Sequence, residues 1–148
     1  MTQRALFSVC AVAAVLLPSM SAQASLGGLA ASVLTDATKW QAPAAVVRKA
    51  QFAVYTQTTP DGVTVRQYVS PAGTVFAVAW EGPVLPDLEV LLATYFSIYR
   101  DALQQRRRSV RIDSPALFLE SGGMMRAYVG RAYIPAQIPA GMTAVDIL

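Results

Sequence analysis

The side chains that most often carry enzyme chemistry are nearly absent from this sequence. Its 148 residues contain no histidine and a single cysteine, Cys10. Serine–histidine and cysteine–histidine catalysis both need an imidazole to accept the proton of the nucleophile, so neither can be assembled. Zinc sites built on imidazole or thiolate are excluded by the same lack of ligands. No glycine loop has the lysine and the spacing that cradle a phosphate. The sequence therefore predicts no metal site and no cofactor.

Carboxylates are the remaining candidates for acid–base chemistry. A pair of them could hydrolyse a glycoside if the fold brought them together. Several positions favour structural roles instead: Asp61 lies in a turn sequence, Asp87 precedes a helix, and Glu89 falls in its first turn. No segment has the closely spaced acidic ligands of a calcium loop. We assign no catalytic residue among the nine, which are Asp36, Asp61, Glu81, Asp87, Glu89, Asp101, Asp113, Glu120 and Asp146.

Three arginines and a tryptophan form the candidate binding set. They occur within strand-like segments whose other residues are mostly apolar, and they are Arg66, Trp80, Arg126 and Arg131. On one exposed face of a sheet they would form a mixed aromatic and cationic surface that could bind a partner. The alternative interpretation is structural, because arginines in strands commonly lie outward across neighbouring side chains and Trp80 could fill the core.

A second basic feature is the run Arg106-Arg107-Arg108, with Arg111 shortly after it. Clustered guanidinium groups could meet anionic lipid or polysaccharide. The run also stands at the predicted end of a helix, where cations offset the negative pole of the helix dipole, and this interpretation is the simpler one. The net charge of +3 is small. We therefore expect no nucleic-acid partner.

The N-terminus has the organisation of a secretory signal peptide. Arg4 is followed by a thirteen-residue apolar run from Ala5 to Leu17, and the small residues Ala22-Gln23-Ala24 come after Pro18. The run fits a signal core and is shorter than the roughly 20 residues of a membrane-spanning helix. We predict cleavage between Ala24 and Ser25, no permanent membrane anchor, and export to the periplasm or beyond the cell. Cys10 would leave with the signal peptide.

Three parts are predicted along the chain: a signal peptide over 1–24, a flexible N-terminal arm over 25–45 and a single domain over 46–148. Alternating and apolar segments separated by turn residues predict strands within 47–57, 63–69 and 74–80, and then within 116–120 and 124–134. Ser121-Gly122-Gly123 is expected to be the turn of the last hairpin. A short apolar segment, 144–148, could add an edge strand.

One helix is predicted between the two groups of strands. Asp87 can cap it, and apolar residues recur with helical spacing from Leu88 to Leu103. The aromatic residues of that stripe, Tyr95, Phe96 and Tyr99, are expected in the core. The order β-β-β-α-β-β indicates an α+β domain, in which one amphipathic helix packs on one face of an antiparallel sheet.

Several stretches resemble the bacterial domain-of-unknown-function family DUF2844. They are Leu26-Gly27-Gly28, 65–69, 73–80, Gly82-Pro83, Pro86-Asp87-Leu88, Tyr95-Phe96 and 130–135. The resemblance covers almost all of the chain after the signal peptide. It implies an exported bacterial protein and carries no established activity or catalytic residue. Gln67 departs from the pattern, which has an acidic residue there.

The leading hypothesis is a non-enzymatic envelope protein that binds another envelope protein or a surface polymer through one sheet face or its N-terminal arm. The alternative is an enzyme that uses carboxylates or tyrosine on an envelope or extracellular substrate. It requires two carboxylates to converge in one concave pocket. A third possibility, a protein of the membrane surface, requires the arginine run at 106–108 to adjoin exposed apolar side chains.

Overall fold

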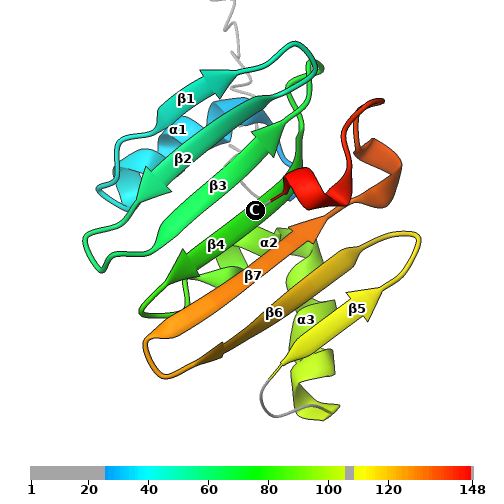
Figure 1. The fold of residues 1–148 in the computed structure, drawn as a ribbon. Coiled ribbons are helices and arrows are strands. Elements are labelled where there is room, and N and C mark those ends of the chain that lie inside the picture. The colour runs from blue at the N-terminus through cyan, green and yellow to red at the C-terminus, as the bar shows by residue number, and fades with distance from the viewer. Residues whose placement is uncertain (1–25, 106–108, 148) are drawn as a thin grey trace, which may run out of the picture.

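A computed structural model describes residues 26–105 and 109–147, and these form a seven-stranded antiparallel sheet with helices (Figure 1). The predicted signal peptide, its cleavage site at Ala24 and Ser25, and the arginine run at 106–108 lie outside the described residues. The strands are β1 (Ala45–Arg48), β2 (Ala53–Thr58), β3 (Thr64–Val69), β4 (Val75–Gly82), β5 (Val110–Asp113), β6 (Phe118–Met124) and β7 (Ala127–Tyr133). The helices are α1 (Ala30–Lys39), α2 (Leu88–Leu92), η1 (Ala93–Tyr95), α3 (Phe96–Gln105), η2 (Pro135–Gln137) and η3 (Ala144–Asp146).

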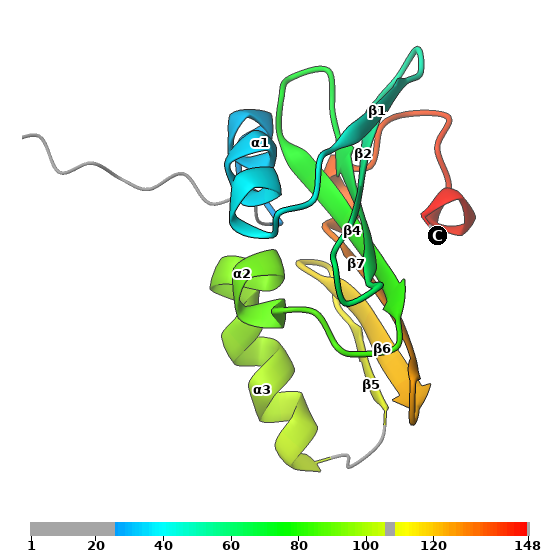
Figure 2. The same ribbon diagram turned by 90° about the vertical axis from the view of Figure 1, so that its left-hand side faces the viewer.

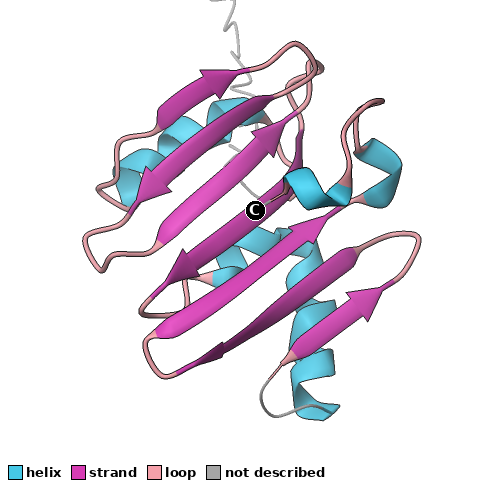
Figure 3. Cartoon of the chain, in the orientation of Figure 1, coloured by secondary structure: helices cyan, strands magenta, loops and turns pink. Residues whose placement is uncertain are grey.

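Two groups of strands meet in the middle of the sheet. The order across it is β1-β2-β3-β4-β7-β6-β5, so four consecutive strands form a meander and the last three return beside β4 (Figure 3). Glycine turns hold the meander together: Gly62 and Gly73 adopt φ of 81° and 80° in the β2–β3 and β3–β4 turns. Only glycine enters this region without a steric penalty from Cβ. The α+β class with an antiparallel sheet is confirmed.

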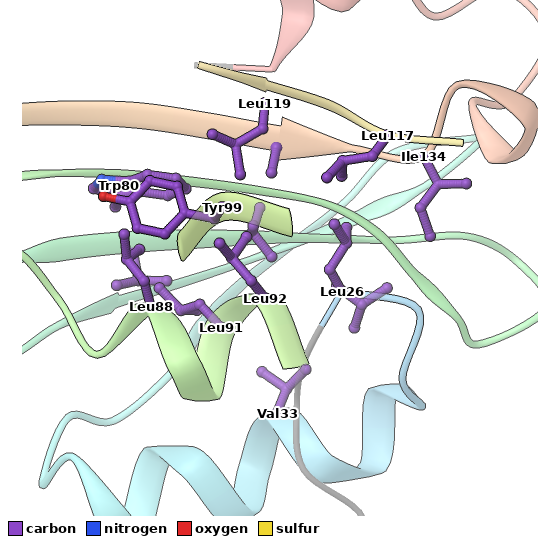
Figure 4. Close-up of a cluster of buried hydrophobic side chains, with 14 of the residues drawn as sticks. Leu26, Val33, Trp80, Leu88, Leu91, Leu92, Tyr99, Leu117, Leu119 and Ile134 are labelled. Carbon is purple, nitrogen blue, oxygen red and sulfur yellow. The ribbon is translucent and has the colours of Figure 1, made fainter. Parts of the chain in front are cut away.

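The helices α1, α2 and α3 cover one face of the sheet (Figure 2), which we call the helix face. Asp87 caps α2 as predicted, since its carboxylate accepts a hydrogen bond from the Val90 amide at 3.1 Å. The large hydrophobic cluster lies between the helices and the sheet (Figure 4). Fully buried members come from both layers, among them Leu91, Leu92, Trp80 and Leu119. Burial of each such side chain is worth about 2 kcal/mol.

The predicted order of elements was wrong at the N-terminal end of the domain. The segment interpreted as an arm contains α1, and β1 begins at its last residue, Ala45. Backbone hydrogen bonds dock the residues before α1: the Leu26 amide donates to Leu91 and the Gly27 amide to Val75. Val33 anchors the helix itself in the core. A ten-residue helix with so few buried side chains leaves little apolar periodicity in the sequence.

The predicted single long helix was also incorrect. Residues 88–105 are divided into α2, η1 and α3, and the break is at Ala93, whose φ of 45° lies outside the helical region. Tyr99 is buried, while Tyr95 and Phe96 are partly buried against the same cluster. The apolar stripe therefore points inward as far as Tyr99 in spite of the break, whereas Leu103 at its end is exposed. Neither glycine nor proline marks the break in the sequence.

The second hairpin is longer than predicted. β6 runs through Gly122 and Gly123 to Met124, and the turn is made by Met125 and Arg126. One strand, β5, was not predicted at all, because Val110-Arg111-Ile112-Asp113 is only four residues long and polar at every second position. It pairs with β6 and forms one edge of the sheet.

The C-terminal segment covers part of the opposite face of the sheet, which we call the outer face (Figure 2). The predicted edge strand at 144–148 was wrong, because 144–146 form η3. Ile147 is fully buried in a second hydrophobic cluster with aromatic side chains of the outer face, including Tyr68, Phe76, Phe118 and Tyr133. Residues 135–147 thus act as a cap over one half of this face. None of the helices in the described part of the chain is long and apolar enough to cross a membrane.

Candidate functional site

The half of the outer face that the cap leaves uncovered contains an open cavity of about 640 Å³. We call it the outer-face trough. Side chains from five strands and from the end of the cap surround it, among them Arg66, Glu81, Arg111, Glu120, Val129 and Arg131. Its volume lies in the range of roughly 300–1,000 Å³ that is typical of ligand sites.

The register of the strands places these side chains side by side on the outer face. Successive residues of a strand point to opposite faces, so every second residue shares the outer face. Arg66 pairs with Ala79, Ala79 with Arg131, Arg131 with Glu120 and Glu120 with Arg111. One row of paired positions therefore crosses β3, β4, β7, β6 and β5. The neighbouring row contributes Glu81, Val129 and Gly122.

The charged side chains of the trough form ion pairs with one another. Glu120 accepts from Arg131 Nε at 2.6 Å through Oε1 and from Arg111 Nη1 at 3.4 Å through Oε2. Arg66 Nη2 donates to Glu81 Oε1 at 2.6 Å. Three guanidinium groups thus face two carboxylates, which leaves one positive charge in excess. The excess lies toward β5, where two arginines share a single glutamate.

Arg131 also ties the cap to the trough. Its Nη1 donates to the carbonyl oxygens of Ala144 at 2.8 Å and of Ile147 at 3.2 Å. The cap has a local support of its own, because Asp146 accepts hydrogen bonds from the backbone and the side chain of Thr143, and these bonds lower the pKa of its carboxyl.

An aromatic pair lies beneath the two arginines that share Glu120. Phe118 and Tyr133 stack with ring centroids 4.7 Å apart and an interplanar angle of 15°. The guanidinium carbons of Arg111 and Arg131 lie 5.2 Å and 5.8 Å from the Phe118 ring, within the range of cation–π attraction. Burial raises the pKa of Tyr133 and the charge of Arg131 partly opposes this rise, so the phenol is neutral at physiological pH.

The strand backbone forms the floor of the trough near Gly130 and Gly122. On the helix face Trp80 packs directly beneath Gly130, where a Cβ atom would overlap its indole ring and lie 2.8 Å from the Glu120 carbonyl oxygen. Gly122 has more room, because a Cβ there would meet nothing closer than the Ser109 Cβ at 3.7 Å. The Trp80 indole nitrogen is buried without a hydrogen-bond partner.

The structure brings together three of the four predicted binding residues at the trough. Arg66 and Arg131 present their guanidinium groups there, whereas Trp80 lines the trough but is only 1% exposed, and its indole ring fills the core on the helix face. Arg126 lies in the β6–β7 turn with a φ of 66° and does not line the trough. Arg111 and Glu120 also line the trough, and neither was among the binding residues predicted from the sequence. The alternation of β6 places Glu120 on the same face as Phe118, and this signal was available.

A family model described as a protein of unknown function, DUF2844, matches residues 22–147. The chain belongs to the DUF2844 family. No curated protein and no solved structure matches it. The resemblance seen in the sequence is therefore confirmed over nearly the whole DUF2844 chain.

Gln67, which departs from the DUF2844 pattern seen in the sequence, is not part of the trough. Its side chain is fully buried on the helix face, and neither amide atom has a hydrogen-bond partner. The nearby Gln57 is also fully buried, with its Nε2 donating to the Val33 carbonyl oxygen at 3.2 Å. Both glutamines are therefore core residues, and Gln57 contacts α1.

Two carboxylates of the DUF2844 chain, Glu81 and Glu120, line the same trough. They lie on β4 and β6 with β7 between them, opposite Val129 and Arg131 respectively. Strand spacing and rise place their Cα atoms about 12 Å apart. Both are held by arginines, as described above. In the described part of the chain no group of acidic side chains is arranged to hold a metal ion.

Proposed function

We propose that this DUF2844 protein is an exported, non-enzymatic binding module, and that the outer-face trough is its binding surface. The observation that supports this most is the row of three arginines and a glutamate that crosses four strand pairings beside the end of the cap. The cap covers the aromatic half of the same face and leaves this charged half open to a partner.

The trough combines a rigid base with available donors. Its side chains project from five neighbouring strands of the seven-stranded sheet, so their spacing is set by backbone pairing. A binding site on strands loses less conformational entropy on binding than one on mobile loops. Arg111 is 62% exposed and Glu81 53%, so both can exchange water for a ligand.

Binding is better supported than catalysis. Glycosidase carboxyl groups stand roughly 5–9.5 Å apart, and one of them must act as an acid. Glu81 and Glu120 each accept a charge-assisted hydrogen bond from an arginine, and protonation of either one to form the acid would weaken that bond. The enzyme alternative rests on these two residues, and it predicts that Glu120→Gln abolishes hydrolysis of an envelope polymer.

Export is the second part of the proposal. It is supported by the sequence of residues 1–24, in which a charged start, an apolar core and a small-residue cleavage site occur in order. An exported chain would place the trough in contact with envelope proteins and polymers, in the periplasm or outside the cell. Mass spectrometry of the N-terminus in the native host tests this part: a chain that begins at Ser25 supports export, and an uncleaved chain contradicts it.

Blocking the trough tests the binding surface. Val129 is 59% exposed in the trough and Ile98 is 42% exposed on α3, so either can become tryptophan with little effect on folding. We expect Val129→Trp to weaken retention of the purified protein on envelope material of its host by about tenfold, because the indole occupies the site. Ile98→Trp is the matched control and should change retention by less than about twofold. Equal retention of both variants would reject the trough as the binding surface.

A further inference from the structure

We infer that the ligand of the trough is an oligosaccharide that carries scattered carboxylates, as a hexuronate-containing polymer does. The inference rests on the proposed binding function and adds the chemical class of the ligand. It follows from three features of the trough: unused guanidinium donors, carboxylates set among them, and the absence of an uncovered aromatic platform among its described residues.

Arg111 is the strongest candidate for contact with a ligand carboxylate. A guanidinium has five N–H donors in a planar fork, and Arg111 uses one of them, on Glu120 at 3.4 Å. Its position above Phe118 holds the group in place. A carboxylate can accept two parallel hydrogen bonds from such a fork, which makes this pair stronger than a bond to a neutral group.

Arg66 adds a second site of the same kind at the other end of the row. It uses one N–H on Glu81, and its side chain is partly exposed. Four strand spacings separate β3 from β5, which is about 19 Å across the sheet. A ligand that meets both arginines is therefore an extended chain with separated charges, rather than a single small anion.

Glu81 and Glu120 argue against a ligand of high charge density. They lie among the three arginines, so these ion-paired side chains of the trough carry only one excess positive charge. A polyphosphate or a nucleic acid would place several negative charges against these carboxylates, at an energetic cost. Hydroxyl groups of a sugar can donate to the same carboxylates and accept from the arginines, because a hydroxyl is both donor and acceptor.

The aromatic side chains argue against a ligand held chiefly by stacking. Phe118 and Tyr133 are less than a tenth exposed, and the cap covers the cluster to which they belong. Trp80 belongs to the core on the helix face. Sugar rings would therefore be held by hydrogen bonds and ion pairs, and affinity would depend on the ligand's carboxylates.

Calorimetric titration with oligogalacturonate tests the inference, with the protein purified in the form in which the host exports it. Two ligand controls separate its parts: the methyl ester of the same oligomer keeps the hydroxyls and loses the charges, and inorganic polyphosphate keeps a high charge without the sugar. We expect the free acid to bind, and both controls to bind at least about tenfold more weakly.

A pair of protein variants locates the contact. Arg111→Gln removes the exposed guanidinium of the trough, and Arg100→Gln removes an equally exposed one from α3, where Arg100 pairs with Asp101. We expect about tenfold weaker binding for Arg111→Gln and a change of less than about twofold for Arg100→Gln.

Equal effects of the two variants, or tighter binding of the ester or of polyphosphate, would overturn the inference. If none of the probes binds while Val129→Trp still lowers retention on envelope material, the ligand class is wrong and the binding function stands.

Discussion

Arg131 shows how one residue can serve two structures. Its Nε pairs with Glu120 in the trough, and its Nη1 holds two carbonyl groups of the cap. A lysine could not make these bonds together, because its ammonium is a single point of charge. The geometry of the trough and the position of the cap therefore depend on the same side chain, and neither can change without the other.

At Gly130 the absence of a side chain is required by packing. Gly130→Ala would place a methyl group against the Trp80 ring and 2.8 Å from the Glu120 carbonyl oxygen. Overpacking of a core costs about 1–3 kcal/mol, and we expect a loss near 2 kcal/mol in urea unfolding. Gly122→Ala is the matched control on the next strand, where the added methyl group meets ordinary contacts. Equal stability of the two variants would contradict the close packing of Trp80 under Gly130.

At the scale of elements, the turns that contain a glycine at positive φ were predictable, and the other turns and chain breaks were not. The turn residues before Val63 and around Gly73 are visible in the sequence, so β3 and β4 were located closely. The single strand predicted within 47–57 was wrong, because this segment contains the end of β1, a turn and most of β2. The end of α2 at Ala93 has no such signal. The apolar spacing continues through it because α2 and α3 both turn their apolar sides toward the sheet.

The break at Ala93 makes a testable prediction about backbone strain. Alanine at a φ of 45° and a ψ of −115° is in a region that favours glycine. We expect Ala93→Gly to raise the free energy of unfolding by about 1 kcal/mol. Ala102→Gly, inside α3, should lower it by about the same amount, because glycine is a poor helix former. If both variants lose stability equally in urea unfolding, α2 and α3 are one continuous helix.

Short elements explain most of what sequence analysis missed. α1 is anchored by few buried residues, with Val33 at its centre, and β5 has four residues of which Val110 alone is fully buried. Such elements are stabilised by contacts with distant parts of the chain, here with β4 and β6. Local periodicity is weak in both cases, so the tertiary contacts decide their structure.

At the scale of the whole molecule, the candidate site results from topology. Arg66 and Arg111 are separated by four strand pairings and by the helices α2 and α3 in sequence, and only the return of β7 beside β4 places them in one row. The sequence indicated arginines in strands, and the pattern of β3 and β7 could place two of them. The sequence pattern could not predict the strand order, which places Arg111 and its partner Glu120 beside these two arginines.

The two faces of the sheet differ in what covers them. The helix face carries the large hydrophobic cluster and stabilises the domain. The outer face is divided between an aromatic half under the cap and a charged half that is open. Removal of the cap would expose the aromatic half as well, so the cap leaves the charged half as the accessible part of this face.

Site-specific photo-crosslinking in the native host tests whether the trough is the binding surface. Ser109 stands at the rim of the trough and Ser97 is exposed on α3, so a photoreactive residue at each position compares the two faces. We expect position 109 to capture one dominant envelope component and position 97 to capture none, and we expect Val129→Trp to abolish the product. The same product from both positions, or a product at position 97 alone, would contradict the assignment of the trough as the binding surface.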